Sequence, residues 1–129
     1  MTDLNLAFGD PPKRDGTCTA QSDMTFSVAG QLDADIDAVI AAGPAAGVEV
    51  FLSVGGGGGD QIIIQFYNAR LSAPLVASLD RYVRAHHYDG VDVDTEDRAN
   101  MGQPYASLVC LLALNLHAEG KLVTGAVAK

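Results

Sequence analysis

The stretch of sequence that decides the fold is Tyr88–Asp97, which runs YDGVDVDTED. It follows a segment with helical periodicity and precedes a polar loop, and its alternation of apolar and acidic residues predicts one β-strand. Because side chains alternate along a strand, its two central valines lie on one face. Asp92, Asp94 and Glu96 then lie on the other face, with neighbours about 7 Å apart.

These three carboxylates have no basic residue among them, so they repel one another unless protons are shared or donors surround them. Coupled acids at the end of a strand suit general acid catalysis on a sugar or a phosphate. A solvated loop edge explains such an acidic pattern equally well. An EF-hand calcium loop is excluded, because counting from Asp92 its glycine and glutamate positions hold Asp97 and Gln103.

The same residues carry a family resemblance. The segment Asp89–Glu96, DGVDVDTE, resembles the DGxDxDxE signature of family 18 glycoside hydrolases, the chitinases and endo-β-N-acetylglucosaminidases. Upstream, Val50–Gly56, VFLSVGG, resembles the SxGG strand end of that family, and Asp3–Phe8 and Leu122–Val127 resemble its second and fifth barrel strands. The resemblance therefore covers about strands two to five of a barrel.

Hydrophobic periodicity predicts strands and helices in alternation. The segments expected to be strands are Asp3–Phe8, Val48–Val54, the acidic stretch and Leu122–Val127, and the expected helices are Asp33–Ala42, Ser72–His86 and Pro104–Glu119. Gln61–Asn68 fits a helix or a strand, and a short helix is favoured. Asp33 and Ser72 are the expected N-caps of their helices. Pro44 either helps to break the first of these helices or lies in its last turn, and Gly47 ends it.

Two glycine-containing segments interrupt this pattern. Gly9–Gly30 predicts a long loop, with a short extended piece at Met24–Val28. Gly55–Gly59, five consecutive glycines, predicts a flexible loop. Phosphate-binding patterns do not fit this run, because Asp60 replaces the last glycine of the dinucleotide motif and no Gly-Lys-Ser/Thr follows. In the family interpretation, the first two of these glycines let the substrate and neighbouring strands approach closely.

The alternation implies parallel strands joined by right-handed crossovers. The pattern alone fits both a small doubly wound sheet and part of a (β/α)8 barrel, and the resemblance favours the barrel. A complete barrel needs about 250 residues, whereas this chain has 129. We therefore expect an α/β fold, a single half TIM barrel over residues 1–129 with about four parallel strands. Its open edges predict a homodimer or higher oligomer through the barrel edges, and a truncated piece of a longer enzyme is the alternative.

The resemblance implies roles for the acidic residues. Glu96 would be the general acid, Asp94 would orient the acetamido group of the substrate, and Asp92 would share charge with Asp94. The acetamido oxygen attacks the anomeric carbon in this family, so no nucleophile from the enzyme is required. The residues implied to bind substrate or shape the adjoining strand end are Ser53, Gly55, Gly56 and Asp89.

The chain also departs from the family. Chitinases usually carry an aromatic residue where Thr95 stands, the sixth-strand tyrosine has no counterpart, and the chain contains no tryptophan to floor a sugar site. Two functions follow. One is hydrolysis of β-1,4 N-acetylglucosamine linkages in chitin or N-glycans, complete only in an assembly. The other is a catalytically inactive carbohydrate-binding or truncated half-barrel protein.

Composition limits the classes of molecule that the protein is expected to bind. A net charge of −8 argues against nucleic acid and against an anionic membrane surface, and it is compatible with a neutral sugar containing N-acetylglucosamine. Cys18 and Cys110 form neither a disulfide framework nor a metal motif, and we expect no metal and no cofactor. No basic or apolar leader follows Met1, which predicts a cytoplasmic protein if Met1 is the natural start. The aliphatic run Leu108–Leu114 is far shorter than a membrane span.

Overall fold

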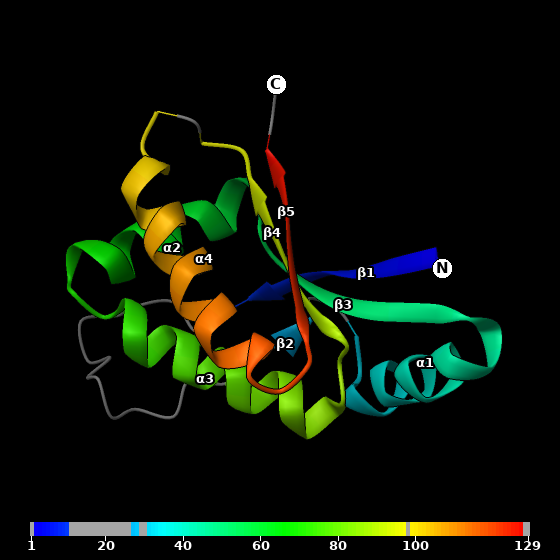
Figure 1. The fold of residues 1–129 in the computed structure, drawn as a ribbon. Helices are drawn as coiled ribbons and strands as arrows, with labels where there is room; N and C mark the ends of the chain where they lie inside the picture. Colours follow the sequence, from blue (N-terminus) through cyan, green and yellow to red (C-terminus); the bar gives the residue numbers. More distant parts are fainter. Residues whose placement is uncertain (1, 11–26, 29–30, 98, 128–129) are drawn as a thin grey trace.

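The computed structural model describes residues 2–10, 27–28, 31–97 and 99–127 (Figure 1). Within these ranges the elements are β1 (Thr2–Asp10), β2 (Ser27–Val28), α1 (Asp33–Ala46), β3 (Val48–Gly55), α2 (Gly56–Asn68), α3 (Ser72–His86), β4 (Gly90–Thr95), α4 (Gly102–His117) and β5 (Leu122–Val127). The described strands form one sheet in the order β2-β1-β3-β4-β5. Strands β1, β3, β4 and β5 are parallel, and β2 pairs antiparallel with the end of β1. The predicted half α/β barrel is confirmed.

The helices cover one face of this sheet. Figure 1 shows α2, α3 and α4 grouped on one side of β4 and β5. Val91 and Val93 of β4 point into this layer and are 0% exposed. On α4 the buried positions recur every four residues, which is the spacing of one helical face. The buried residues of α4 are Pro104, Leu108, Leu112 and Leu116.

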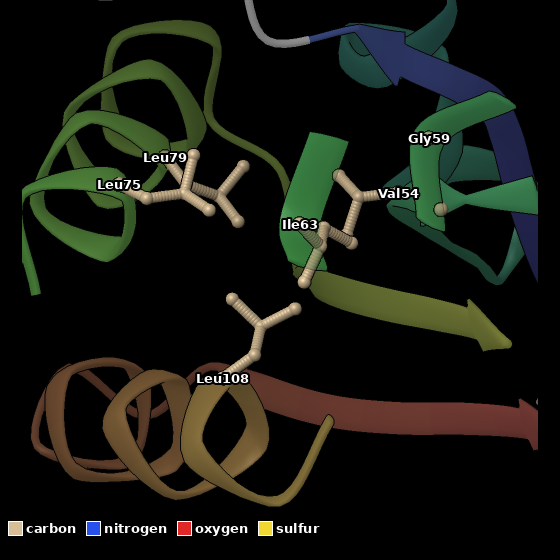
Figure 2. A pocket seen from close by; sticks show the side chains of 7 residues that line it. Val54, Gly59, Ile63, Leu75, Leu79 and Leu108 are labelled. Carbon is tan, nitrogen blue, oxygen red and sulfur yellow. The ribbon is translucent and has the colours of Figure 1, made fainter. Parts of the chain in front are cut away.

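The helical layer closes around a small apolar cavity of about 10 Å³. Figure 2 shows side chains from β3, α2, α3 and α4 turned toward this space. Its lining includes Val54, Ile63, Leu75, Leu79 and Leu108, all of them aliphatic. A space of this size and lining is a packing defect of the core and offers no room for a sugar.

The predicted flexible loop over Gly55–Gly59 is wrong from its second residue onward. Gly56 begins α2, so the predicted Gln61–Asn68 helix starts earlier and takes in the glycines. Glycine is a poor helix former, but local propensity yields here to tertiary packing. Ile63 and Phe66, further along the same helix, are 4% and 0% exposed and anchor it to the core.

Two helices begin one residue earlier than their predicted N-caps imply. Asp33 and Ser72 are the first residues of their helices, and the leucine before each of them makes no capping hydrogen bond. Helix α1 continues beyond Ala42, with Pro44 in its last turn. Gly47 then ends the helix with a left-handed φ of 67°.

Other expectations fall partly outside the described residues. Most of the predicted Gly9–Gly30 loop lies there, while Ser27–Val28 forms β2 within the expected extended piece. Cys18 also lies outside the described ranges, and Cys110 is a free, exposed thiol on α4. Among the described helices, none combines the length and apolar character needed to cross a membrane.

Candidate active site

The acidic residues lie in order of increasing exposure along β4 and just beyond it. Asp92 is 6% exposed, Asp94 is half-buried, and Glu96 is exposed directly after the last strand residue, Thr95. Asp92 and Asp94 alternate with the two buried valines, so they face away from the helices. The row therefore leads from the sheet interior to the carboxyl end of β4.

Asp92 is fixed by hydroxyl groups from both neighbouring strands. Ser53 of β3 and Thr124 of β5 stand opposite Asp92 in the parallel registers. Ser53 Oγ donates to Asp92 Oδ2 at 3.1 Å, and Thr124 Oγ1 donates to Asp92 Oδ1 at 2.7 Å. Two donors, one on each oxygen, fix the rotamer of the carboxyl group.

Asp94 occupies the next position on the same face, between Gly55 of β3 and Ala126 of β5. Burial raises the pKa of Asp94, and the negative charges of Asp92 and Asp60 raise it further. Asp94 therefore retains a proton at a higher pH than an ordinary aspartate does. A carboxyl group in this state can donate a hydrogen bond as well as accept one.

Glu96 lies against the glycine-rich start of α2. The backbone N–H groups of Glu96 and Asp97 both donate to Asp60 Oδ2, at 2.7 Å and 2.8 Å. A β-carbon added at Gly57 would stand 3.1 Å from Glu96 Oε2. The absence of a side chain at this position therefore leaves room for the carboxyl group of Glu96.

Gly55 at the end of β3 and Gly56 at the start of α2 allow neighbouring strands to approach closely, whereas their predicted contact with substrate stays a prediction. Gly55 has φ 108°, and an added β-carbon would lie 2.1 Å from the carbonyl oxygen of Asp94. Gly56 has φ 70°, and an added β-carbon would lie 3.1 Å from the ring of Phe8. Both positions combine a positive φ with a close contact, so both require glycine.

Asp89 does not join the other predicted site residues. It precedes β4, so all of Gly90–Thr95 separates it from Glu96. Its Oδ2 accepts the Val50 N–H at 2.7 Å, and its carbonyl oxygen accepts the Leu122 N–H at 3.1 Å. These contacts join three strands near their amino ends, whereas Glu96 follows the carboxyl end of β4. Asp89 is thus placed to stabilise the sheet, and its predicted role in substrate binding has no geometric support.

Comparison with solved structures indicates the same fold as the sequence motifs do. No family model and no curated protein sequence matches the chain. Among solved structures, the GH18 chitinase ChiB of Flavobacterium johnsoniae superposes with a TM-score of 0.73 and 24% identity, over 98% of this chain and 39% of its own. A GH18 chitinase from Pseudoalteromonas aurantia gives a TM-score of 0.70 and 24% identity, over 95% of this chain and 47% of its own. The chain therefore has the fold of part of the barrel of these two chitinases.

The half-barrel spans less than half the length of either chitinase. The acidic row stands at the carboxyl end of β4, one of its parallel strands. In (β/α)8 barrels this end of the strands carries the active site. At the level of fold, the half-barrel therefore contains the strand ends that form one side of such a site.

Two residues beside the acidic row were missed in the sequence. Thr124 lies within an apolar strand, and only the register of β5 places it opposite Asp92. Asp60 appeared only as a mismatch in a dinucleotide motif, yet it is fully buried beside Glu96. The sequence feature that could have identified Asp60 is a single acidic residue between the glycine run and the apolar part of a helix. Among the described residues, no cluster of three or more histidine, cysteine or acidic side chains is arranged to hold a metal ion.

Proposed function

We propose that this half-barrel hydrolyses β-1,4 linkages of N-acetylglucosamine in chitin or N-glycans, once further strands complete the site. The proposal rests on the graded row in which Asp92 is buried, Asp94 is half-buried and Glu96 is exposed at the carboxyl end of β4. A general acid must reach the glycosidic oxygen, and Glu96 is the exposed member of the row. The family 18 fold supports the same assignment.

In the proposed reaction, Glu96 protonates the glycosidic oxygen as the bond to the anomeric carbon breaks. The acetamido oxygen of the substrate attacks the anomeric carbon, so Asp94 acts on the acetamido group and not on the carbon. The raised pKa of Asp94 supports this role, because a retained proton lets it share a hydrogen bond with that group. Burial is the main cause of the raised pKa of Asp94, and the charge of Asp92, which is fixed by its two hydroxyl donors, raises it further.

The remaining strands must come from another chain or from a longer form of this one. Within the described residues, β5 pairs only with β4, and the outer edge of β1 is paired only at its end, by β2. Leu4 and Leu122, at these two edges, are 40% and 46% exposed. We propose that two copies pair β1 with β5 across a two-fold axis, which would close eight parallel strands. A longer chain that supplies the missing strands is the alternative.

A second candidate function is a catalytically inactive carbohydrate-binding half-barrel. The absence of tryptophan favours it, because aromatic rings commonly form the floor of sugar sites. Open edges favour it too, since an incomplete site orients a substrate poorly. In this case the acidic row would bind a carbohydrate without transferring a proton, or would have no chemical function.

Hydrolysis of chito-oligosaccharides and of a high-mannose glycan distinguishes the two functions. The purified chain is compared with Glu96→Gln, which keeps the shape of the side chain but cannot donate the proton. Glu49→Gln makes the same chemical change near the opposite end of β3 and is the control. The proposal expects activity in the chain and the control, and none in Glu96→Gln. No product from any of the three would favour the inactive protein, and equal product from all three would contradict the role of Glu96 as the general acid.

Light scattering at the assay concentration tests the assembly separately. A dimer that loses activity on dilution, as it dissociates, supports completion of the site by a second copy. An active monomer would contradict the proposed closure but not the proposed chemistry.

A further inference from the structure

Asp60 is a buried charge beside the site with no assigned role. It is 0% exposed, and burial of a carboxylate is costly unless donors surround it. Its Oδ2 accepts two N–H groups, while its Oδ1 has no hydrogen-bond partner among the described residues. Stability of the helical layer alone would favour an apolar side chain here. The contacts of Asp60 therefore point to a function at the loop that follows β4.

The two hydrogen bonds begin where the sheet ends. Thr95 is the last residue of β4 paired with β5, so no neighbouring strand fixes the backbone of Glu96. Asp60 Oδ2 accepts the N–H groups of Glu96 and Asp97 at 2.7 Å and 2.8 Å. Two consecutive N–H groups directed at one oxygen fix the peptide plane between them. Asp60 therefore fixes the backbone of Glu96, where pairing with the neighbouring strand has ended.

The next residue of α2 reinforces this attachment. Gln61 Nε2 donates to Asp97 Oδ2 at 2.8 Å, so the side chain of Asp97 is held by the same helix as its backbone. Asn100 Nδ2 also donates to Asp97, at 3.2 Å and 3.1 Å to the two carboxylate oxygens. The loop after β4 is therefore attached to the start of α2 through both backbone and side chains.

We propose that Asp60 is a positioning residue, which fixes the backbone at the end of β4 so that the carboxyl group of Glu96 is directed at the glycosidic oxygen. This inference rests on the proposed function, and Asp60 itself touches no reacting atom. A misplacement of about 1 Å can lower a rate about 100-fold. Loss of the two hydrogen bonds should therefore lower kcat and leave KM nearly unchanged, because substrate binding does not use Asp60.

The test compares Asp60→Ala, Asp60→Asn and Asp80→Ala. Asparagine retains a carbonyl oxygen that can accept both N–H groups, so Asp60→Asn should restore the positioning without the charge. Asp80 is the matched control, because it is 5% exposed and has one unpartnered buried oxygen, but it lies on α3 and pairs with Arg84. Amide hydrogen exchange at Glu96 and Asp97 measures the attachment directly, without any substrate.

In Asp60→Ala, exchange at both amides should accelerate by about tenfold, since a charge-assisted acceptor is lost. Hydrolysis of chitotetraose should fall by about 10–100-fold in kcat. Hydrolysis of an aryl N-acetylglucosaminide with an acidic phenol as leaving group should fall much less, because that leaving group needs little protonation. Asp60→Asn should recover most of each loss, and Asp80→Ala should leave the amides and the ratio of the two rates unchanged.

Unchanged amide exchange in Asp60→Ala would overturn the inference whatever the activity. Equal losses on the two substrates would also overturn it, since that pattern indicates general damage to the fold. If the unaltered chain hydrolyses neither substrate, the proposed function fails. The positioning is then decided by amide exchange at Glu96 and Asp97, which should accelerate in Asp60→Ala but not in Asp60→Asn or Asp80→Ala.

Discussion

Alanine substitutions within the glycine run should have opposite effects at its two ends. Gly55 has φ 108°, and an added β-carbon would lie 2.1 Å from the carbonyl oxygen of Asp94 and 3.2 Å from Asp60 Oδ1. Gly59, in the first turns of α2, has no atom within 4 Å of an added β-carbon. Figure 2 shows Gly59 among the residues that line the small apolar cavity. One position is therefore closed to a side chain, and the other is open.

The magnitudes follow from these contacts. At Gly55 the positive φ costs an alanine about 1–2 kcal/mol, and displacement of β3 from β4 adds about 1–3 kcal/mol. Gly55→Ala should thus lower the free energy of unfolding by about 3 kcal/mol and the Tm by roughly 10–15 °C. At Gly59 the helix propensity of alanine favours folding by about 1 kcal/mol, which raises the Tm by roughly 3–5 °C.

Urea and thermal denaturation followed by circular dichroism measure both variants. Gly58→Ala is a second variant with open space, on the exposed side of the helix, and should also stabilise the protein. If Gly55→Ala and Gly59→Ala change the free energy of unfolding equally, the run does not form a strained turn followed by a helix. A destabilised Gly59→Ala would refute the assignment of this glycine to α2.

Two further predictions concern charge and packing. Because the folded pKa of Asp94 is raised, its ionisation reduces stability as the pH rises above the ordinary value of 3.8. Asp94→Asn should therefore melt slightly higher than the unaltered chain at pH 7, by about 1–3 °C, and this difference should vanish below pH 3.8; a lower Tm at pH 7 would contradict the sign. Leu112 is 0% exposed and Leu114 is 72% exposed on the same helix. Leu112→Ala should reduce the free energy of unfolding by about 2–5 kcal/mol, and Leu114→Ala by less than about 0.5 kcal/mol, in urea titrations; equal effects would contradict the orientation of α4.

The elements with strong local patterns were predictable. Alternating valine and aspartate in β4 fixed which side chains face the helices, because a strand has a period of two. Apolar spacing in Ser72–His86 predicted α3 through His86, with its start displaced by one residue. The glycine run was not predictable in this way. Its helical conformation depends on the burial of Ile63 and Phe66, and that tertiary contribution outweighs a propensity that disfavours a helix.

The sequence by itself determined the alternation of strands and helices, the family resemblance and the order of the acidic residues along one strand. Only the tertiary structure decided which residues surround them. Thr124 reaches Asp92 across 32 positions of sequence, and Asp60 reaches the backbone of Glu96 across 36. Such contacts depend on strand register and on how a helix packs after its strand, and local periodicity carries information on neither. The same limit explains why the sequence grouped Asp89 with the site. A motif shows only adjacency in sequence, whereas an extended strand separates the residue before its start from the residue after its end.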